Sequence, residues 1–266
     1  MTTLTKFTFL AIMAITLNSC NLMAAAGIGS SGQPTKKVGE QLTSSSENSV
    51  VNIDHSAWDK MLKKYVNDAG FVDYKGFTSE QAHLQGYLTM LSKMEPNEDW
   101  SVQELLAYYI NLYNAATVEL ILENYPIKSI KDIKGAWSKD FVKIGDKEIS
   151  LGAIEHGVLR KMNEPRIHFA INCASYSCPK LMNEAFTASK INEQLDKATK
   201  EFINGDKNEI SANHPKLSKI FDFYTGDFKV DGKKDVIAYI NQYSKIKINP
   251  NSRYTFKAYD WNLNAQ

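Results

Sequence analysis

Several features that would assign this 266-residue chain to a common class are missing from it. Its 31 Lys and Arg residues are balanced by 30 Asp and Glu residues, so it lacks the basic excess of a nucleic-acid-binding protein. Three cysteines are too few for a scaffold built on disulfides. We therefore expect no nucleic-acid partner and no disulfide-held miniature fold.

Motifs of familiar enzyme chemistries are missing as well. The chain has no H-E-x-x-H zinc motif, no glycine-rich phosphate loop and no G-x-S-x-G element. Its cysteines and histidines do not have zinc-finger spacing. We expect neither a metal nor a cofactor. The chain is 43% hydrophobic and 11% aromatic, which suffices to bury a sizeable core.

Residues 1–20 are typical of an export signal. Lys6 supplies positive charge, and the apolar run over residues 7–17 is too short to span a bilayer as a helix. The run ends in Leu17-Asn18-Ser19-Cys20, which resembles a bacterial lipobox, where the cysteine is lipidated after cleavage. A plain signal cleavage near the alanines at 24–26 is the alternative.

The sequence thus predicts a membrane partner, reached through lipid on Cys20. By resemblance to lipoproteins of diderm bacteria, Asn21 favours the outer membrane, with the protein facing the periplasm or the cell surface. Residues 21–50 are rich in Gly, Ser and Thr and predict a flexible tether. Residues 51–266 are expected to form one globular domain, and no apolar run in it stands out as long enough to span a membrane.

Periodicity in this domain predicts an α+β fold with a buried central helix. Ser101 and Glu104 form a capping box that starts a helix running to Asn124, and this helix is apolar on nearly all sides. Helices and strands do not alternate regularly, which favours α+β. The other expected elements are helices over 55–68, 79–94, 150–162, 233–244 and from 187 or 189 onward, a hairpin over 141–149, and strands over 166–173 and 253–259.

Residues 166–179 hold the densest group of reactive side chains. On a straight strand His168 and Asn172 point to one side, and Cys173 points to the other side with the apolar residues. His168 and Asn172 can therefore share a site. On such a strand, however, His168 cannot activate Cys173.

Cys178 stands before Pro179, a residue favoured at the first position of a helix. A helix N-terminus lowers a thiol pKa, so Cys178 is a candidate nucleophile with His168 or His156 as base and Ser175 as a nearby binding residue. A Cys173–Cys178 disulfide is the first alternative, because exported proteins meet an oxidising compartment. So short a loop gains only about 2 kcal/mol from the bond. Two inert buried thiols are the second alternative.

The predicted helix over 150–162 carries Glu155, His156 and Arg160. His156 and Arg160 are four residues apart and share a stripe. Either Glu155 orients a histidine and Arg160 holds an anion, or the three form a buried polar network, which is the commoner arrangement. Gly157 within the helix costs about 1 kcal/mol relative to Ala and indicates close approach by another backbone.

Asn111 and Asn114 share a face of the central helix. A buried amide without partners costs about 1–3 kcal/mol. The two amides therefore either brace the segment at 166–173 or face a cleft, where an asparagine can orient a histidine or bind an oxyanion. The remaining histidines, His55, His83 and His214, have no useful spacing and are expected at the surface or in loops.

Four stretches of the chain resemble the domain of unknown function 547 family. They are Ile110-Asn-Leu-Tyr-Asn-Ala115, Leu151-Gly-Ala-Ile-Glu-His-Gly-Val-Leu-Arg160, His168-Phe-Ala-Ile-Asn-Cys-Ala-Ser-Tyr-Ser-Cys-Pro179 and Tyr259-Asp-Trp-Asn-Leu-Asn264. The resemblance implies a single domain, found in exported bacterial and larger plant proteins, and implies no reaction. A looser resemblance is to papain-like and transglutaminase-like folds, whose central helix starts at a cysteine. Here that helix starts Trp100-Ser-Val-Gln-Glu, so such a site would be degenerate or rebuilt around Cys178.

Two functions follow from these residues. The favoured one is a lipid-tethered binding or assembly domain whose polar pocket takes a small molecule, a peptide or an envelope component. The alternative is a thiol-dependent enzyme of acyl transfer or hydrolysis. It would use Cys178 as nucleophile, His168 or His156 as base, Glu155 as orienting group, and Asn172 or Asn111 as oxyanion donor. A thiol oxidoreductase is disfavoured, because four residues separate the cysteines instead of two.

Overall fold

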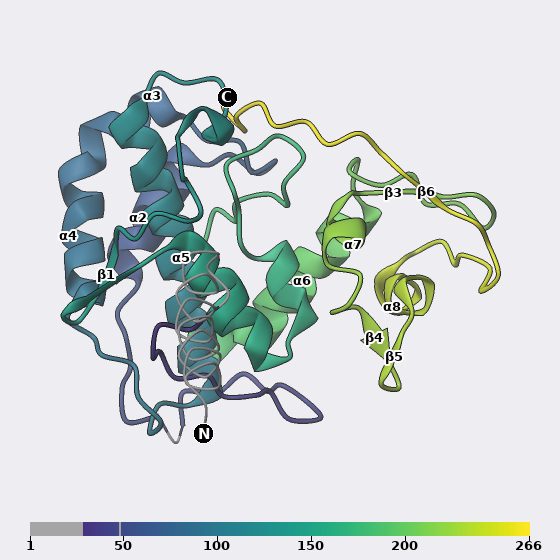
Figure 1. The fold of residues 1–266 in the computed structure, drawn as a ribbon, viewed down its shortest axis with the longest axis horizontal. Coiled ribbons are helices and arrows are strands. Elements are labelled where there is room, and N and C mark those ends of the chain that lie inside the picture. Colours follow the sequence, from purple (N-terminus) through teal and green to yellow (C-terminus); the bar gives the residue numbers. More distant parts are fainter. Residues whose placement is uncertain (1–28, 48) are drawn as a thin grey trace, which may run out of the picture.

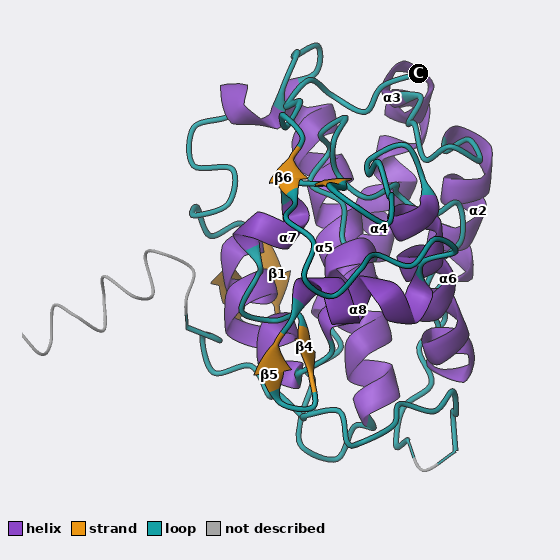
Figure 2. Ribbon diagram, turned by 90° about the vertical axis from the view of Figure 1, so that its right-hand side faces the viewer, coloured by secondary structure: helices purple, strands orange, loops and turns teal. Residues whose placement is uncertain are grey.

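The computed structural model describes residues 29–47 and 49–266, which pack around the central helix α5 (Val102–Asn124) (Figure 1). The predicted signal peptide over 1–20 and its lipidation site Cys20 lie outside the described residues. The domain is α+β, as predicted, with helices dominating and only short strands beside them (Figure 2). Helix α4 (Gln81–Ser92) lies along α5.

Short helices and two-stranded sheets make up the rest of the described domain. The pairs β1–β2 and β4–β5 are antiparallel, and β3–β6 is parallel. The other α-helices are α2 (Ser56–Tyr65), α3 (Tyr74–Phe77), α6 (Ile191–Asn204), α7 (Ile220–Phe223) and α8 (Val236–Tyr243). The strands are β1 (Val142–Ile144), β2 (Lys147–Ile149), β3 (Lys216–Leu217), β4 (Lys229–Val230), β5 (Lys233–Lys234) and β6 (Thr255–Phe256). The 3₁₀ turns cover Thr78–Glu80, Ile130–Asp132, Leu159–Met162, Pro165–Phe169 and Ala188–Lys190.

Helix α5 begins where the sequence predicts. The Ser101 side chain accepts a hydrogen bond from the Glu104 N–H at 3.1 Å. The Glu104 carboxylate does not close the capping box, because it accepts the Ile53 N–H at 2.8 Å instead. By length and composition α5 is apolar enough to cross a membrane, which the sequence analysis did not expect beyond residue 50. Its apolar window is wholly buried inside the domain, as the core helix of a globular protein is, and only its last two residues are exposed.

The predicted strand over residues 166–173 is wrong. Pro165–Phe169 form a 3₁₀ turn, which starts at Pro165 and is capped by the Glu164 side chain on the Arg166 N–H (3.1 Å). The alternation was misleading because consecutive residues 167–170 are all buried, so the segment has no polar face. The alternation of side chains along a strand therefore does not tell which of these residues share a site.

The predicted helix over 150–162 is present, but most of it is not a regular α-helix. The Ser150 hydroxyl caps it by accepting the Ala153 N–H at 3.1 Å, and a π-helical turn over Ala153–Val158 then leads into a 3₁₀ turn. A side-chain carbon on Gly157 would lie 2.2 Å from the Gly29 carbonyl oxygen. The close backbone approach expected at this glycine is confirmed. π-helical turns of this kind are frequent at functional sites.

Residues 29–47 lie against the domain. Val38 and Leu42 are buried, and the Val38 N–H donates to the Met162 carbonyl at 2.8 Å. This part of the segment predicted to be a flexible tether (21–50) is thus in contact with the core. The domain boundary near residue 51 stays a prediction.

The C-terminal segment returns from β6 across the domain to α3 (Figure 1). Ala265 pairs with Val72 and Leu263 pairs with Ser175 through isolated bridges. This return places Tyr259 and Trp261 beside the loop that carries the two cysteines. The predicted last strand over 253–259 is reduced to Thr255–Phe256.

His55 is buried, contrary to the expectation that it lies at the surface. Its Nδ1 is 2.7 Å from the Tyr87 hydroxyl, and its Nε2 has no hydrogen-bond partner among the described residues. Burial lowers the pKa of His55 from 6.5 to about 4, because the charged ring would lose its hydration.

We expect the His55→Gln variant to lose less stability in acid than the wild type. The folded-state pKa of His55 is depressed, so its contribution is present above pH 6.5 and is lost as the pH falls toward 4. The difference amounts to roughly 2–3 kcal/mol of unfolding free energy. Denaturant titrations at pH 7.0 and pH 4.5 measure it, with His214→Asn as an exposed control. Equal acid sensitivity of wild type and His55→Gln would contradict the assignment.

Candidate active site

A cavity of about 200 Å³ lies where the π-helical turn, the cysteine loop, α7 and the C-terminal segment meet. All four side chains predicted as catalytic candidates line it, although they were drawn from separate segments. Its lining consists of Tyr113, Trp137, Glu155, His156, His168, Ile171, Cys173, Cys178, Pro179, Ile220, Phe223, Tyr224, Tyr259 and Trp261.

Cys173 and Cys178 are free thiols, so the predicted disulfide between them is wrong for this structure. Their sulfur atoms are 2.7 Å apart, whereas a disulfide bond is about 2.05 Å long. The Cys173 N–H donates to the Cys178 sulfur at 3.0 Å. Hydrogen bonds rather than a covalent link therefore close this loop.

No helix starts at Pro179, so the dipole argument for Cys178 fails. Residues 179–187 are irregular, and Cys178 is buried. Burial and the neighbouring Cys173 sulfur raise the pKa of the Cys178 thiol. Cys178 is therefore suited to donate its proton to a neighbour rather than to ionise.

Cys173 has the opposite character, although the sequence analysis placed it among apolar residues. It is partly exposed, and the Cys178 thiol, the Ser175 hydroxyl (3.2 Å) and the Tyr259 hydroxyl (3.5 Å) all lie within hydrogen-bonding distance of its sulfur. The hydrogen bond from Cys178 contributes most, and with the hydroxyls it outweighs burial and lowers the pKa of Cys173 to about 7. The ionisable thiol of this cavity is therefore Cys173.

Asn172 shapes the cysteine loop. Its amide group donates to the Pro179 carbonyl at 2.7 Å, and its side-chain oxygen accepts the Ala174 N–H at 2.8 Å. Ala174 takes a left-handed conformation with φ of 59°. Asn172 thus fixes both ends of the loop, and it does not line the cavity as an oxyanion donor would.

Asn111 and Asn114 brace the site segments, which is one of the two alternatives that the sequence left open. The Asn114 amide donates to the Ala170 carbonyl at 3.0 Å and accepts the Asn172 N–H at 2.8 Å. Asn111 makes the same two-way contact with the backbone of Phe186, at 2.7 and 3.0 Å. Each amide therefore gives one backbone C=O and one backbone N–H the hydrogen bonds that a neighbouring strand would supply in a sheet.

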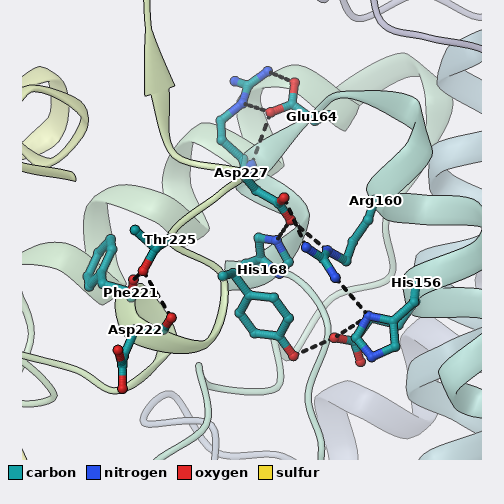
Figure 3. A network of polar contacts seen from close by, with 11 residues as sticks. His156, Arg160, Glu164, His168, Phe221, Asp222, Thr225 and Asp227 are labelled. Carbon is teal, nitrogen blue, oxygen red and sulfur yellow. Dashed lines mark hydrogen bonds and ion pairs between the residues drawn. The ribbon is translucent and has the colours of Figure 1, made fainter. Parts of the chain in front are cut away.

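A polar network joins the π-helical turn to the loop after α7 (Figure 3). Arg160 binds both carboxylate oxygens of Asp227, at 2.6 and 3.0 Å, and it also contacts His156 Nδ1 at 3.2 Å. Asp227 in turn lies 2.8 Å from His168 Nε2. Of the two alternatives for this helix, the structure shows the polar network, in which the anion that Arg160 holds is the Asp227 side chain.

His168 serves this network and does not contact a cysteine through a hydrogen bond. Its ring stacks on Tyr224 at 3.9 Å, and burial lowers its pKa despite the opposing effect of Asp227. His168 Nδ1 has no partner among the described residues, which fits a neutral ring that donates from Nε2. Burial raises the pKa of Asp227, but the hydrogen bonds from His168 and Arg160 outweigh it and hold that pKa well below its usual range.

Glu155 is held by two tyrosines. Tyr224 and Tyr113 donate to its carboxylate, the latter at 3.3 Å. The carboxylate is 3.8 Å from His156 Nδ1, so it is near the histidine without bonding to it. The His156 side chain is 34% exposed, and it is the more accessible of the two histidines in the cavity.

Aromatic side chains line the outer part of the cavity. The ring centroids of Trp261 and Tyr259 are 4.5 Å apart, and those of Phe223 and Tyr259 are 5.7 Å apart. Trp261 also packs edge-on against Trp137, with 6.0 Å between their ring centroids. Sequence reasoning named none of these four as site residues, although the family resemblance included Tyr259 and Trp261. Tyr224 and Asp227 were missed too, because their surroundings match no motif and no periodic pattern.

Comparison with known proteins places this site in a family. Residues 97–203 match the model described as "Protein of unknown function, DUF547". This segment, which is less than half of the chain, belongs to the DUF547 family. No curated protein and no solved structure matches the chain. The DUF547 match covers α5, the π-helical turn and both thiols, whereas Tyr224, Asp227 and Tyr259 lie C-terminal to it.

We expect Asn114→Ala to destabilise the protein by roughly 2–4 kcal/mol. The substitution leaves the buried Ala170 carbonyl and Asn172 N–H without partners. Asn124→Ala, at the exposed end of the same helix, is the matched control and should change stability by less than about 1 kcal/mol. Chemical denaturation measures both, and similar losses would show that the backbone bracing is unimportant.

Proposed function

We propose that this DUF547 protein is a thiol-dependent enzyme of acyl transfer or hydrolysis, with Cys173 as its nucleophile. The observation that carries the proposal is a partly exposed cysteine that lines a cavity, with three groups able to donate hydrogen bonds within reach of its sulfur. Thiolates are the reactive form of cysteine, and such donors favour the thiolate at neutral pH.

In the first step, the Cys173 thiolate attacks the carbonyl carbon of an ester or amide. A carbon–sulfur bond forms and the carbonyl electron pair moves to oxygen. When the carbonyl re-forms, the bond to the leaving group breaks, and the leaving alcohol or amine takes up one proton from solvent. Water then attacks the thioester and breaks the carbon–sulfur bond, which releases the carboxylic acid, the Cys173 thiolate and one proton.

His156 is the base that we assign to the water step. Its side chain lines the cavity and is partly exposed, whereas His168 is buried and bonded to Asp227. Glu155 lies 3.8 Å from His156 Nδ1. That nitrogen accepts a hydrogen bond from Arg160 at 3.2 Å, so it takes up the water proton when the Arg160 contact opens. The function favoured from the sequence is a lipid-tethered binding or assembly domain without catalysis, and the proposed enzyme differs from it because the bound substrate reacts. The aromatic side chains that line the cavity would cover an apolar part of the substrate.

We expect iodoacetamide to label Cys173 with a midpoint near pH 7, and Cys178 to stay unlabelled. Tyr259→Phe removes one hydroxyl near the sulfur, so its labelling midpoint should move to higher pH. Tyr176→Phe, at an exposed position in the same loop, should leave the profile unchanged. Peptide mapping by mass spectrometry gives the site and the rate. A quantitative Cys173–Cys178 disulfide in the native protein would disprove the proposal.

Turnover is tested on the full chain with p-nitrophenyl acetate, a small activated ester. Wild type should release nitrophenol and carry a transient acetyl group on Cys173, and Cys173→Ala should do neither. Tyr176→Phe is again the control. If iodoacetamide labels Cys173 but the ester leaves no acetyl group on it, the thiol is reactive and the proposal of an acyl-transfer enzyme is wrong.

We also propose that lipid on Cys20 anchors the protein to the outer membrane. The support is the lipobox-like Leu17-Asn18-Ser19-Cys20. In a diderm host, the wild type should carry lipid and fractionate with outer membranes. The Cys20→Ala variant should do neither. Cys173→Ala is the cysteine control. If both proteins fractionate in the same way and neither carries the added mass of a lipid, the anchor is ruled out.

A further inference from the structure

A second cavity, of about 390 Å³, lies between α4, α5 and β1 and shares no lining residue with the thiol site. In Figure 1 these three elements lie together, on the side of the domain away from α7 and α8. Leu88, Leu112 and Phe141 supply apolar wall, and Glu119 and Glu123 supply two carboxylates.

Glu119 is a buried acid that lacks a cationic partner. It is 6% exposed, and one of its carboxylate oxygens accepts hydrogen bonds from the Gln81 amide at 3.1 Å and the Gln85 amide at 2.7 Å. The other oxygen, Oε2, is buried and has no partner among the described residues. An ionised carboxylate in this position is under-solvated, because two neutral donors replace a full hydration shell.

Glu123 lies one helical turn further along α5 and lines the same cavity. Burial and the charge of Glu119 raise the pKa of Glu123, as expected where two like charges share one side of a helix. In the part of the chain that the structure describes, neither carboxylate forms an ion pair with a lysine or arginine. Lys143 lines the cavity as well but pairs with neither of them.

We propose that this cavity binds an organic cation, an ammonium or guanidinium group at the end of a short alkyl stem. The cationic head would meet the free Glu119 oxygen and the Glu123 carboxylate. The stem would lie against Leu88, Leu112 and Phe141, as the methylenes of lysine and arginine lie on apolar surfaces. A bare inorganic cation would leave those walls without a partner.

The test titrates the full protein with n-butylammonium, followed by ligand-observed NMR. Saturable binding is expected for wild type, and Glu119→Gln, which keeps the shape and removes the charge, should weaken it at least tenfold. Glu123→Gln should weaken it as well, and it serves if Glu119→Gln fails to fold. Glu148→Gln, an exposed acid on β2, is the control that should bind like wild type.

The neutral analogue 1-butanol should not compete. N-acetyl-lysine methylamide separates the two sources of the cation: affinity equal to butylammonium indicates a polypeptide side chain, and tenfold weaker affinity indicates a free amine. Both results keep the cation site. Equal affinity of wild type and both glutamine variants, or no saturable binding of butylammonium to wild type, would overturn it.

Discussion

Two asparagine amides on one buried helix hold the thiol site together. The segments that carry the site have no neighbouring strand, so their backbone N–H and C=O groups need other partners inside the core. Asn114 satisfies the backbone at Ala170 and Asn172, and Asn111 satisfies Phe186. Both amides lie in the buried part of α5, which other elements of the domain cover. The position of Cys173 relative to the cavity therefore depends on these amides.

The thiol is stabilised by neutral donors rather than by a histidine ion pair. Hydroxyl and thiol groups surround the Cys173 sulfur, whereas His168 is committed to Asp227 and Tyr224. Neutral donors stabilise a thiolate without adding a buried charge, which a cation beside it would do. Cys173 is partly exposed and lines the cavity, so the proton that it loses has a route to solvent. Neither histidine is needed to ionise Cys173 in this arrangement.

Sequence patterns predicted the elements better than the site. The cap at Ser101 and the all-round apolar character of α5 were enough to place the central helix. Residues 166–173 misled, because a fully buried stretch carries no periodicity that separates a strand from a turn. Cys178 appeared to be the nucleophile because Pro179 suggested a helix start. The donors that favour Cys173 come partly from Tyr259, 86 residues away, and local spacing cannot show such a contact.

Residues beyond the DUF547 segment, such as Tyr259, also complete the thiol site in this chain. The matched segment over 97–203 supplies the sulfur and its bracing, but Tyr224, Asp227 and Tyr259 follow it. Asp227 neutralises Arg160, and without it the guanidinium would lose both of its hydrogen bonds to a carboxylate. Without Tyr259 and Trp261 the cavity would lose one aromatic wall and a hydroxyl near the thiol. The geometry of the thiol site therefore depends on the returning C-terminal chain as much as on the family segment.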